Sequence, residues 1–390
     1  MSQIERIADL RGLLWPTAER ELVDAFLEKT RFFVKGSAPV RFESLLPRWT
    51  LDRLLSSDLV PATRLYVLRN GDVVPTSHYR TEDGRLRREG LAALAKEGVS
   101  FVVNGIDDDV PAIARLCDAM ERRLGHTVWA NAYVTHGQGG ALAPHYDDHD
   151  VLVIQVEGKK TWFGHGSPVL WPITPSPDDH DFGPSVWEQR LEAGDVLYLP
   201  RGEVHHAEAS GDTSVHVTFG IEPRRGVDLL ETLVETATRD PAFRQDLTRL
   251  GGPGALADQE RLLKDKLHAL VEQTNFMAYL DSDDRRRPLR PMPHLGSSPV
   301  SATSVVVPTV RRAIGDKFAF DEASPLMVGG ATFTLSPSAR RVLAYLCEHE
   351  LGTPTLLLAN LPELGDVQAT CQAMDELVRQ GLARVDPLAT

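Results

Sequence analysis

The sequence lacks several features that would place it outside the soluble globular proteins. It has only three cysteines, Cys117, Cys347 and Cys371, which are far apart and form no CxxC pair. We therefore predict reduced thiols in packed helices, not a disulfide framework or a zinc cluster. No apolar run approaches the roughly 18–20 residues that span a bilayer. The first residues, MSQIERIADLRGLLWP, lack the apolar core of a signal peptide. We expect a cytoplasmic protein without membrane contact.

Excess basic charge is also missing. The chain has 55 acidic and 42 basic residues, a formal net charge of -13. This balance argues against a protein that holds nucleic acid by bulk electrostatics. Residues 331–390 contain four arginines and seven acidic residues, so a DNA-reading surface is not expected there and we predict no direct nucleic-acid binding.

What is present indicates a globular chain of two or three domains, since 390 residues carry 42% hydrophobic and 25% charged side chains. Residues 127–224 contain short β-runs separated by Gly, Pro and Asp, which predicts a barrel or sandwich. Within them, the Pro- and Asp-rich segment 164–188 is expected to be a lid or binding loop, with Trp171 and His180 shielding a site.

Residues 226–280 return to amphipathic helices. Helices appended to a barrel often mediate dimerisation, although they could equally pack on their own chain. The last ninety residues read as helix, helix, long helix and strand, which is the order of a winged helix. We therefore divide the chain into a domain of residues 1–225, a helical segment and linker of residues 226–295, and a module of residues 296–390.

Metal-binding residue types gather in "PHYDDHD", which precedes an apolar strand. Residues two apart on a strand share a face, so His145 and Asp147 can hold one cation together. About sixty residues later, "GDVLYLPRGEVHH" ends in His205 and His206. Two histidines and one carboxylate that leave coordination positions open are the ligand set of a non-haem Fe(II) oxygenase. Taken alone, the H-x-D pair also fits ordinary polarity at a strand end.

The other residues of this cluster are expected to have different roles. By strand parity, Tyr146 and Asp148 should point away from the metal. His149 shares the inward parity but lies one pleat further along. We expect it to pack beside the site without binding the ion.

Lys160 follows the apolar strand after a turn at Glu157 and Gly158. If that hairpin returns the lysine to the barrel interior, the buried ammonium needs an anion, which the distal carboxylate of 2-oxoglutarate would supply. The spacing leaves open a second interpretation, in which Lys159 and Lys160 are both surface turn residues.

Three segments together resemble a known family: "APHYDDHDVLVIQVEGKKTW", "GDVLYLPRGEVHHAE" and "SVHVTFGIEP" are similar to the JmjC-type cupin oxygenases, and within them to the ribosomal oxygenase group. The resemblance implies an α+β fold with a double-stranded β-helix barrel, a helical dimerisation segment and a C-terminal winged-helix domain. It also implies Fe(II), 2-oxoglutarate as cosubstrate, O₂ and a homodimer.

The resemblance assigns roles to individual positions. The implied iron ligands and catalytic residues are His145, Asp147 and His205, and the implied 2-oxoglutarate lysine is Lys160. The "NAY" strand and the "SVHVTF" strand are expected to line the cosubstrate pocket through Asn131, Tyr133, His216 and Thr218.

The implied reaction is the hydroxylation of a protein or peptide side chain, coupled to the decarboxylation of 2-oxoglutarate to succinate. Arg or His of a ribosomal protein are the targets that the resemblance implies, and an acidic groove would suit such a basic partner. The alternatives are a hydroxylase of a ribosomally synthesised natural-product precursor peptide, demethylation by the same chemistry, a cupin enzyme without 2-oxoglutarate, and a non-catalytic metal-binding cupin regulator.

Overall fold

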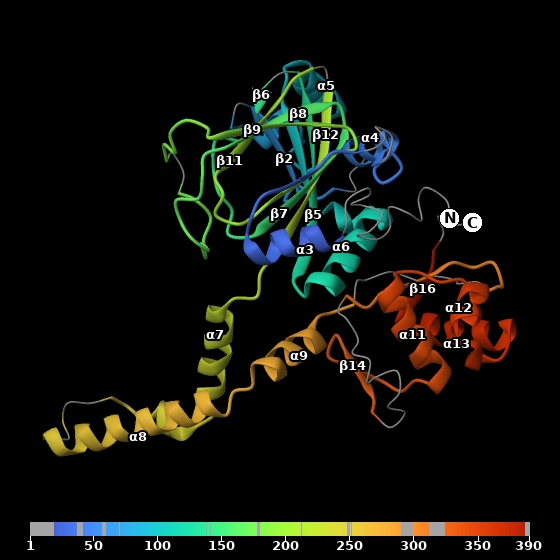
Figure 1. Ribbon diagram of the computed structural model, residues 1–390. Helices are drawn as coiled ribbons and strands as arrows, with labels where there is room; N and C mark the ends of the chain where they lie inside the picture. Colours follow the sequence, from blue (N-terminus) through green and yellow to red (C-terminus); the bar gives the residue numbers. More distant parts are fainter. Residues whose placement is uncertain are drawn as a thin grey trace.

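The computed structural model describes residues 19–36, 42–56, 60–69, 71–137, 139–140, 142–177, 180–211, 213–247, 250, 252–289, 299–311 and 324–386. The end of the expected linker, residues 290–295, and the first three residues of the expected module therefore lie outside the described residues. Figure 1 shows a β-rich domain, a helical arm that leads away from it, and a mostly helical C-terminal module. None of the helices in the described ranges is long and apolar enough to cross a membrane.

The β-rich domain contains a large antiparallel sheet. Its strands, in spatial order, are β1 (Phe32–Val34), β10 (Val196–Leu199), β7 (Asp150–Glu157), β12 (Thr213–Glu222), β5 (Thr127–His136), β4 (Ser100–Asn104), β2 (Leu65–Arg69) and β3 (Asp72–Val73). Strands β2 and β3 pair antiparallel, with Leu68 opposite Val73.

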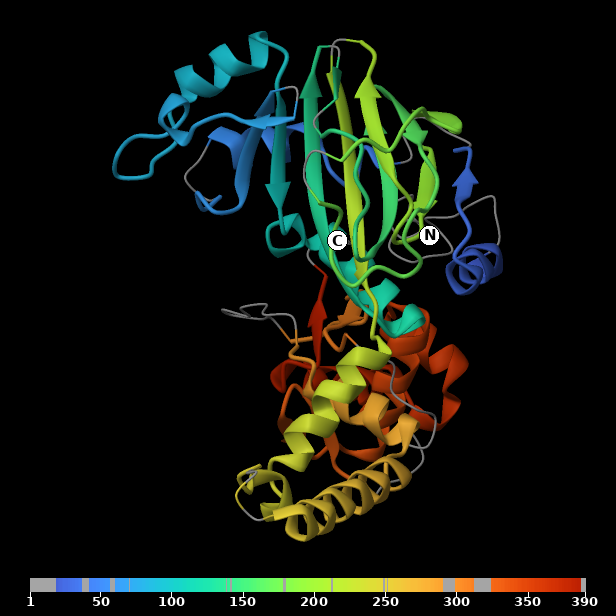
Figure 2. The same ribbon diagram turned by 90° about the vertical axis from the view of Figure 1, so that its left-hand side faces the viewer.

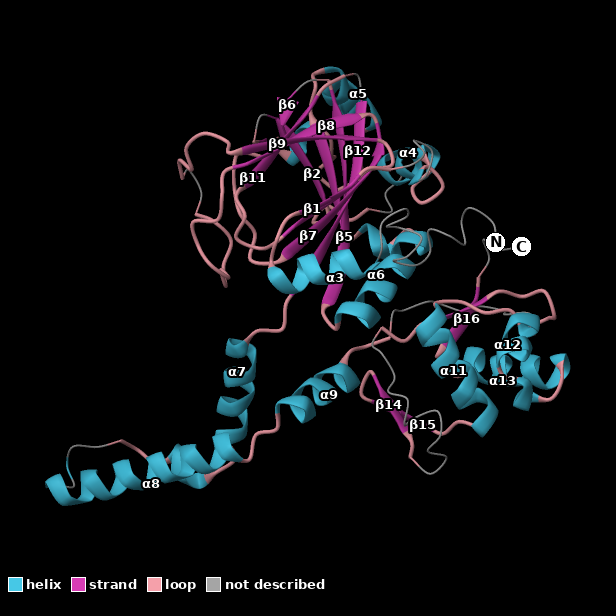
Figure 3. Ribbon diagram, viewed as in Figure 1, coloured by secondary structure: helices cyan, strands magenta, loops and turns pink. Residues whose placement is uncertain are grey.

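A smaller sheet faces the large one. Its strands, in spatial order, are β6 (Gly139–Gly140), β11 (His205–Ala209), β8 (Lys159–Gly164) and β9 (Trp187–Glu192). Among the described strands, the hydrogen-bonded order gives two open sheets and not one closed barrel, so the expected barrel is a cupin-type pair of facing sheets (Figure 3). The expected α+β class and the cupin-type architecture are confirmed at this level.

Alternation along the central strands separates the two faces of the large sheet. In β7, Leu152 and Ile154 belong to the main apolar core, whereas Val151 and Val153 pack toward the small sheet with Trp162. Successive side chains on a strand point to opposite faces, which explains this division. The outer face of the large sheet is therefore a helix-packing surface, and its inner face is available for a site.

Helices cover the outer face of the large sheet. The helices of this domain are α3 (Glu19–Glu28), α4 (Arg48–Ser56), α5 (Arg88–Lys96) and α6 (Pro111–Leu124), with the short 3-10 helices η2 (Thr76–His78) and η3 (Ile106–Asp108). Cys117 of α6 is a free thiol buried in the same core, as predicted for the cysteines.

The helical arm follows β12 and projects away from the sheets (Figures 1 and 2). It consists of α7 (Gly226–Ala237), η4 (Pro241–Arg244), α8 (Gly252–Glu272) and α9 (Phe276–Arg286). None of the three α-helices has a buried residue. Large apolar side chains are instead exposed along the arm, among them Leu230, Val234, Leu262, Leu267, Val271 and Phe276.

The C-terminal module has its own apolar core. Its elements are β13 (Val306–Pro308), β14 (Leu326–Val328), β15 (Ala331–Phe333), α11 (Pro337–His349), α12 (Pro354–Asn360), η6 (Pro362–Leu364), α13 (Val367–Arg379) and β16 (Ala383–Val385). Strand β13 pairs with β16, and β14 pairs with β15. Ser336 caps α11 by accepting a hydrogen bond from the amide of Ala339, as the sequence indicates.

Buried ion pairs join α6 to the C-terminal module. Arg115 pairs with Asp386, and Arg122 pairs with Glu350; all four residues are buried. Arg122 also donates to the carbonyl of Val310, at 2.6 Å. Such charges are stable away from water only when each one is matched.

Glu121 connects three parts of the chain. Its fully buried carboxylate accepts from the amide of Val128 at the start of β5, from Arg287 after α9, and from Arg311 of the C-terminal module, at 2.8, 3.2 and 2.6 Å respectively. The β-rich domain, the end of the arm and the module therefore meet at one carboxylate.

We expect Arg122→Ala to lower the free energy of unfolding by about 3–5 kcal/mol, because it removes the guanidinium that pairs with the buried Glu350 carboxylate. Arg123→Ala is the matched control, since Arg123 is exposed and donates to the carbonyl of Glu348. Urea unfolding followed by circular dichroism measures both. Equal stability of the two variants would contradict the assigned role of the Arg122–Glu350 pair.

Candidate metal centre and its cavity

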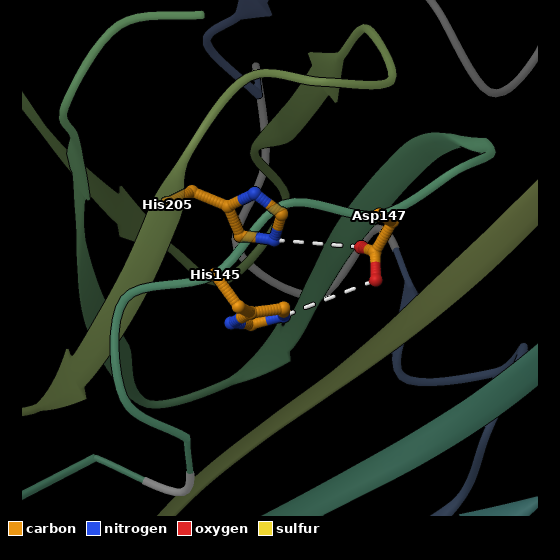
Figure 4. A group of neighbouring side chains, drawn as sticks. All are labelled: His145, Asp147 and His205. Atoms are coloured by element: carbon orange, nitrogen blue, oxygen red, sulfur yellow. Dashed lines mark ion pairs between the residues drawn. The ribbon is translucent and has the colours of Figure 1, made fainter. Parts of the chain in front are cut away.

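Three side chains of the β-rich domain converge on one point. Two of them precede β7 of the large sheet, and the third begins β11 of the small sheet. The ligand atoms of His145, Asp147 and His205 all lie within 4.8 Å of one another. The Nε2 atoms of His145 and His205 lie 4.0 and 3.7 Å from the two carboxylate oxygens of Asp147 (Figure 4). This is the spacing of a group that can share one divalent cation.

The backbone brings the two histidines together. The amide of His145 donates to the carbonyl of His205, and the amide of His205 donates to that of His145, at 3.1 and 2.8 Å. This pair is an isolated bridge, because β7 begins only at Asp150. The expectation that the H-x-D pair lies on the apolar strand is therefore wrong, and cross-strand pairing with His205, not regular strand parity, positions His145.

Both imidazoles present the same nitrogen to the site. The Nδ1 of His145 is 2.8 Å from the carbonyl of Ala143, and the Nδ1 of His205 is 2.9 Å from that of Glu203. These carbonyls require a proton on Nδ1, which leaves Nε2 free as a metal ligand. Burial, with the nearby His145, lowers the pKa of His205 to about 4, so the neutral ligand form of His205 is present at neutral pH.

A cavity of about 410 Å³ opens beside these three residues. All eight positions singled out from the sequence line it: His145, Asp147, His205, Lys160, Asn131, Tyr133, His216 and Thr218. The wall also includes Tyr66, Val73, Trp129 and Leu142. The volume is in the range of pockets that hold small ligands.

Lys160 lies inside this cavity and is 2% exposed. Its Nζ donates to Thr135 Oγ1 at 3.3 Å, and Thr135 in turn hydrogen-bonds Ser100 at 2.9 Å. No carboxylate among the described residues forms an ion pair with it. Burial lowers the pKa of Lys160 to about 7, which is the expected response of an ammonium without a counter-ion.

The route by which Lys160 reaches the interior differs from the expected hairpin. Strands β7 and β8 do not pair with each other; β7 belongs to the large sheet and β8 to the small one. The chain crosses between sheets at Gly158, whose φ of 68° favours glycine and where a Cβ would lie 2.0 Å from the carbonyl oxygen of Thr213. On β8, Lys160 and Trp162 then point inward and Lys159 outward.

The remaining predicted residues form the wall of the cavity next to Lys160. The ring of Tyr133 stacks on His216, with centroids 4.6 Å apart and planes 8° apart. The Nδ1 of His216 is buried without a hydrogen-bond partner among the described residues. The Asn131 side chain accepts from the amide of Gly105 at 3.0 Å. Burial raises the pKa of Tyr133 to about 12, so its hydroxyl remains a donor.

The residues adjacent in sequence to the three candidate ligands lie outside that group, as predicted for His149. His149 packs on Trp129 with centroids 4.9 Å apart and pairs with Asp148 at 3.3 Å, outside the group of three. Tyr146 is buried and binds Ser176 through its backbone. The sequence reasoning missed Trp129, Thr135 and Trp162; the inward alternation of β5 and β8 is the signal that could have found them.

None of the described residues of the segment 164–188 lines the cavity wall. Trp171, expected to shield the site, is 57% exposed. His180 lies beside Phe182, with ring centroids 4.6 Å apart. The exposed apolar rim of the cavity comes instead from Tyr66, Val73 and Leu142.

Comparison with known proteins agrees with this geometry. Residues 108–229 match the family model of the JmjC domain. The bifunctional lysine-specific demethylase and histidyl-hydroxylase NO66 of Drosophila yakuba is 30% identical over 255 residues, which are 63% of this chain and 37% of that protein. The protein of the same name from Dictyostelium discoideum is 29% identical over 228 residues, 55% of this chain and 43% of that protein. The match thus spans well under half the length of these relatives.

Solved structures extend the likeness to most of the chain. The ribosomal oxygenase YcfD of Escherichia coli is 16% identical with a TM-score of 0.57, covering 93% of this chain and 98% of that one. A structure of YcfD in complex with cobalt and 2-oxoglutarate gives 16% identity and a TM-score of 0.57, covering 95% and 99%.

Together, the facing sheets, the cavity and the match of residues 108–229 show that this part of the chain is similar to the JmjC domain. Over most of its length, the chain has a fold similar to that of the solved YcfD structures. The resemblance drawn from the sequence motifs is confirmed.

The free ammonium of Lys160 gives a pH-dependent prediction. At pH 8 a group with a pKa of about 7 is mostly neutral, and an anion such as 2-oxoglutarate beside it raises the pKa again. We therefore expect binding of 2-oxoglutarate at pH 8 to take up close to one proton, and affinity to weaken as pH rises above 7. Calorimetry in two buffers of different ionisation enthalpy measures this uptake.

Lys160→Met is the control for that measurement. It should abolish the proton uptake and weaken binding by about tenfold or more, since a charge-assisted hydrogen bond contributes roughly 1.5–3 kcal/mol. An unchanged affinity in this variant would show that the anion binds elsewhere.

Proposed function

We propose that the protein is an Fe(II)- and 2-oxoglutarate-dependent hydroxylase of a protein or peptide side chain. The observation that carries this proposal is one cavity that holds both the His145, Asp147 and His205 group and the unpaired ammonium of Lys160. A metal group alone fits many cupins. A buried lysine without a carboxylate, in the same cavity, adds the requirement for an anionic small molecule.

The donor set fits Fe(II). Two neutral imidazole nitrogens and one carboxylate on one side of an ion leave its remaining positions open for a cosubstrate and O₂. When bound, the iron would supply the oxidising chemistry that turns a C–H bond into C–OH while 2-oxoglutarate becomes succinate and CO₂. The protein's own part is to hold three ligands in fixed orientation and to keep the reaction in a cavity with little water.

The residues beside Lys160 fit a dicarboxylate. Lys160 would bind its far carboxylate, with Thr135 orienting the ammonium. The neutral Tyr133 hydroxyl, the free Nδ1 of His216 and the Asn131 amide offer further polar contacts in the same wall. Thr218 lies in that wall on the same face of β12 as His216.

The names of the relatives point to a protein substrate, because one is a histidyl-hydroxylase and another a ribosomal oxygenase. We extend this to a ribosomal-protein side chain as the substrate, acted on in the cytoplasm. A natural-product precursor peptide is the alternative that uses the same cavity.

The charge of the cavity favours a neutral substrate side chain. Asp147 is the only carboxylate in its described lining, and the metal would occupy it. A guanidinium entering this space would have no counter-ion. The acidic groove expected for a basic partner is therefore not formed by the described wall of the cavity. A neutral imidazole suits the space between Tyr66, Trp129 and Leu142 better than a charged arginine does.

The arm and the C-terminal module have roles that follow from their surfaces. We propose that the exposed apolar residues of α7 and α8 form a homodimer interface, since isolated helices with such faces gain stability by pairing. The order α11, α12, α13 and β16 supports a winged-helix module. The ion pairs with α6 favour a packing role for it over nucleic-acid binding.

Asp147→Ala should abolish coupled turnover, because it removes the carboxylate ligand. Succinate formation is measured with ribosomal-protein peptides, and the products are analysed for the mass gain of one oxygen atom. We expect oxidation of a histidine peptide and much less of its arginine counterpart. Full turnover by Asp147→Ala would refute the proposed centre, and loss of a methyl group in place of oxygen gain would reassign the enzyme as a demethylase.

The double substitution Leu230→Glu and Val234→Glu should convert a dimer to a monomer, because it places charges on the exposed apolar face of α7. Light scattering coupled to size exclusion measures the mass. Glu231→Gln is the control on the same helix. A wild-type protein that is already monomeric at micromolar concentration would rule out this interface.

A further inference from the structure

The short segment after α3 contacts both of the loops that carry the metal-binding residues. Residues 29–31 precede β1, which pairs with β10 in the register Phe32 to Tyr198. The chain that leaves β10 leads directly to His205. Residues 29–31 are therefore adjacent to the start of that loop, although they lie more than a hundred residues before it in sequence.

Lys29 reaches the first loop. Its ammonium forms an ion pair with Asp150, whose carboxylate is fully buried. The other oxygen of Asp150 accepts from the amide of Arg201 at 2.8 Å, and the amide of Gly202 donates to the carbonyl of Asp147 at 3.0 Å. The Lys29 ion pair thus ends at the point where the two loops are bonded to each other.

Arg31 reaches the second loop. Its guanidinium lies 3.4 Å from the Glu203 carboxylate and stacks over the Trp187 ring at 4.1 Å. Trp187 Nε1 donates to the same carboxylate at 2.7 Å. The backbone carbonyl of Glu203 accepts from Nδ1 of His205. The residue that orients His205 is therefore itself held by Arg31 and Trp187.

The backbone at Lys29 is adapted to this contact. Its φ is 53°, in the left-handed region, and the amide of Thr30 bonds back to the carbonyl of Ala25 at 3.0 Å. This is a helix end at which glycine is the usual residue. A lysine at this φ is strained. A glycine would relieve the strain but would lack the side chain that forms the ion pair.

We infer that Lys29 and Arg31 are positioning residues for the metal centre: they hold the 145–150 loop and the 200–205 loop in the mutual orientation that brings His145, Asp147 and His205 together. The inference rests on the proposed metal centre. It predicts that loss of either cation weakens metal binding without removing a ligand.

Binding of Co(II) is the test, followed by visible absorbance of the ion and run on the full chain. Arg31→Met should raise the Kd for Co(II) about tenfold, the usual effect of losing a residue that orients a ligand. The double substitution Lys29→Met and Asp150→Asn should do the same. It removes both charges, so no buried carboxylate is left unpaired to unfold the protein.

Lys35→Met is the matched control. Lys35 follows the same strand, but its ion pairs, 3.6 Å to Glu192 and 4.0 Å to Asp195, lie away from the two loops. Its Kd should stay within about twofold of wild type. Thermal midpoints are measured for every variant, so that each titration is run on folded protein. The absorbance bands report coordination geometry and should change only in the two positioning variants.

Each outcome decides the inference. Weaker Co(II) binding in both positioning variants, with Lys35→Met unchanged, supports it. Wild-type affinity and wild-type bands in both variants overturn it while leaving the metal centre intact. A wild-type protein that binds no Co(II) overturns the metal centre and the positioning role together.

Discussion

The candidate site depends on one pair of backbone hydrogen bonds, between His145 and His205. The two residues are far apart in the chain, and closing such a loop costs conformational entropy that contacts elsewhere must offset. The facing sheets provide those contacts: β7 and β10 pair in the large sheet, while β11 and β8 pair in the small one. The bridge between His145 and His205 links the segment before β7 to the start of β11. Asp147 lies two residues after the bridge.

The local pattern of the sequence was sufficient to predict which residues share a face. Asn131 and Tyr133 on β5 share a face, as do His216 and Thr218 on β12, because strand alternation is a local property. That all four line one cavity was implied by the family resemblance. Motif spacing similarly joined the H-x-D pair to His205. The roles of His145, Asp147 and His205 as ligands stay predictions, but their side chains do converge in space.

Non-local pairing could not be predicted in the same way. Nothing in the sequence around Gly158 distinguishes a hairpin from a crossing between two sheets, because either places alternate residues of β8 inward. The segment 164–188 was expected to shield the site from its length and composition alone. Its exposed Trp171 shows that such features identify an excursion but not the surface on which it lies.

Buried charge has opposite consequences at two places in this protein. Lys160 has no counter-ion among the residues that the structure describes, and an anionic ligand would match its charge. On α6, Arg115, Glu121 and Arg122 are each matched by charges from elsewhere in the chain. An interface of matched charges differs from an apolar interface when its two sides separate. The charged groups become hydrated, whereas apolar groups would expose hydrophobic surface. The C-terminal module is therefore attached to α6 through charges that become hydrated again when the module separates.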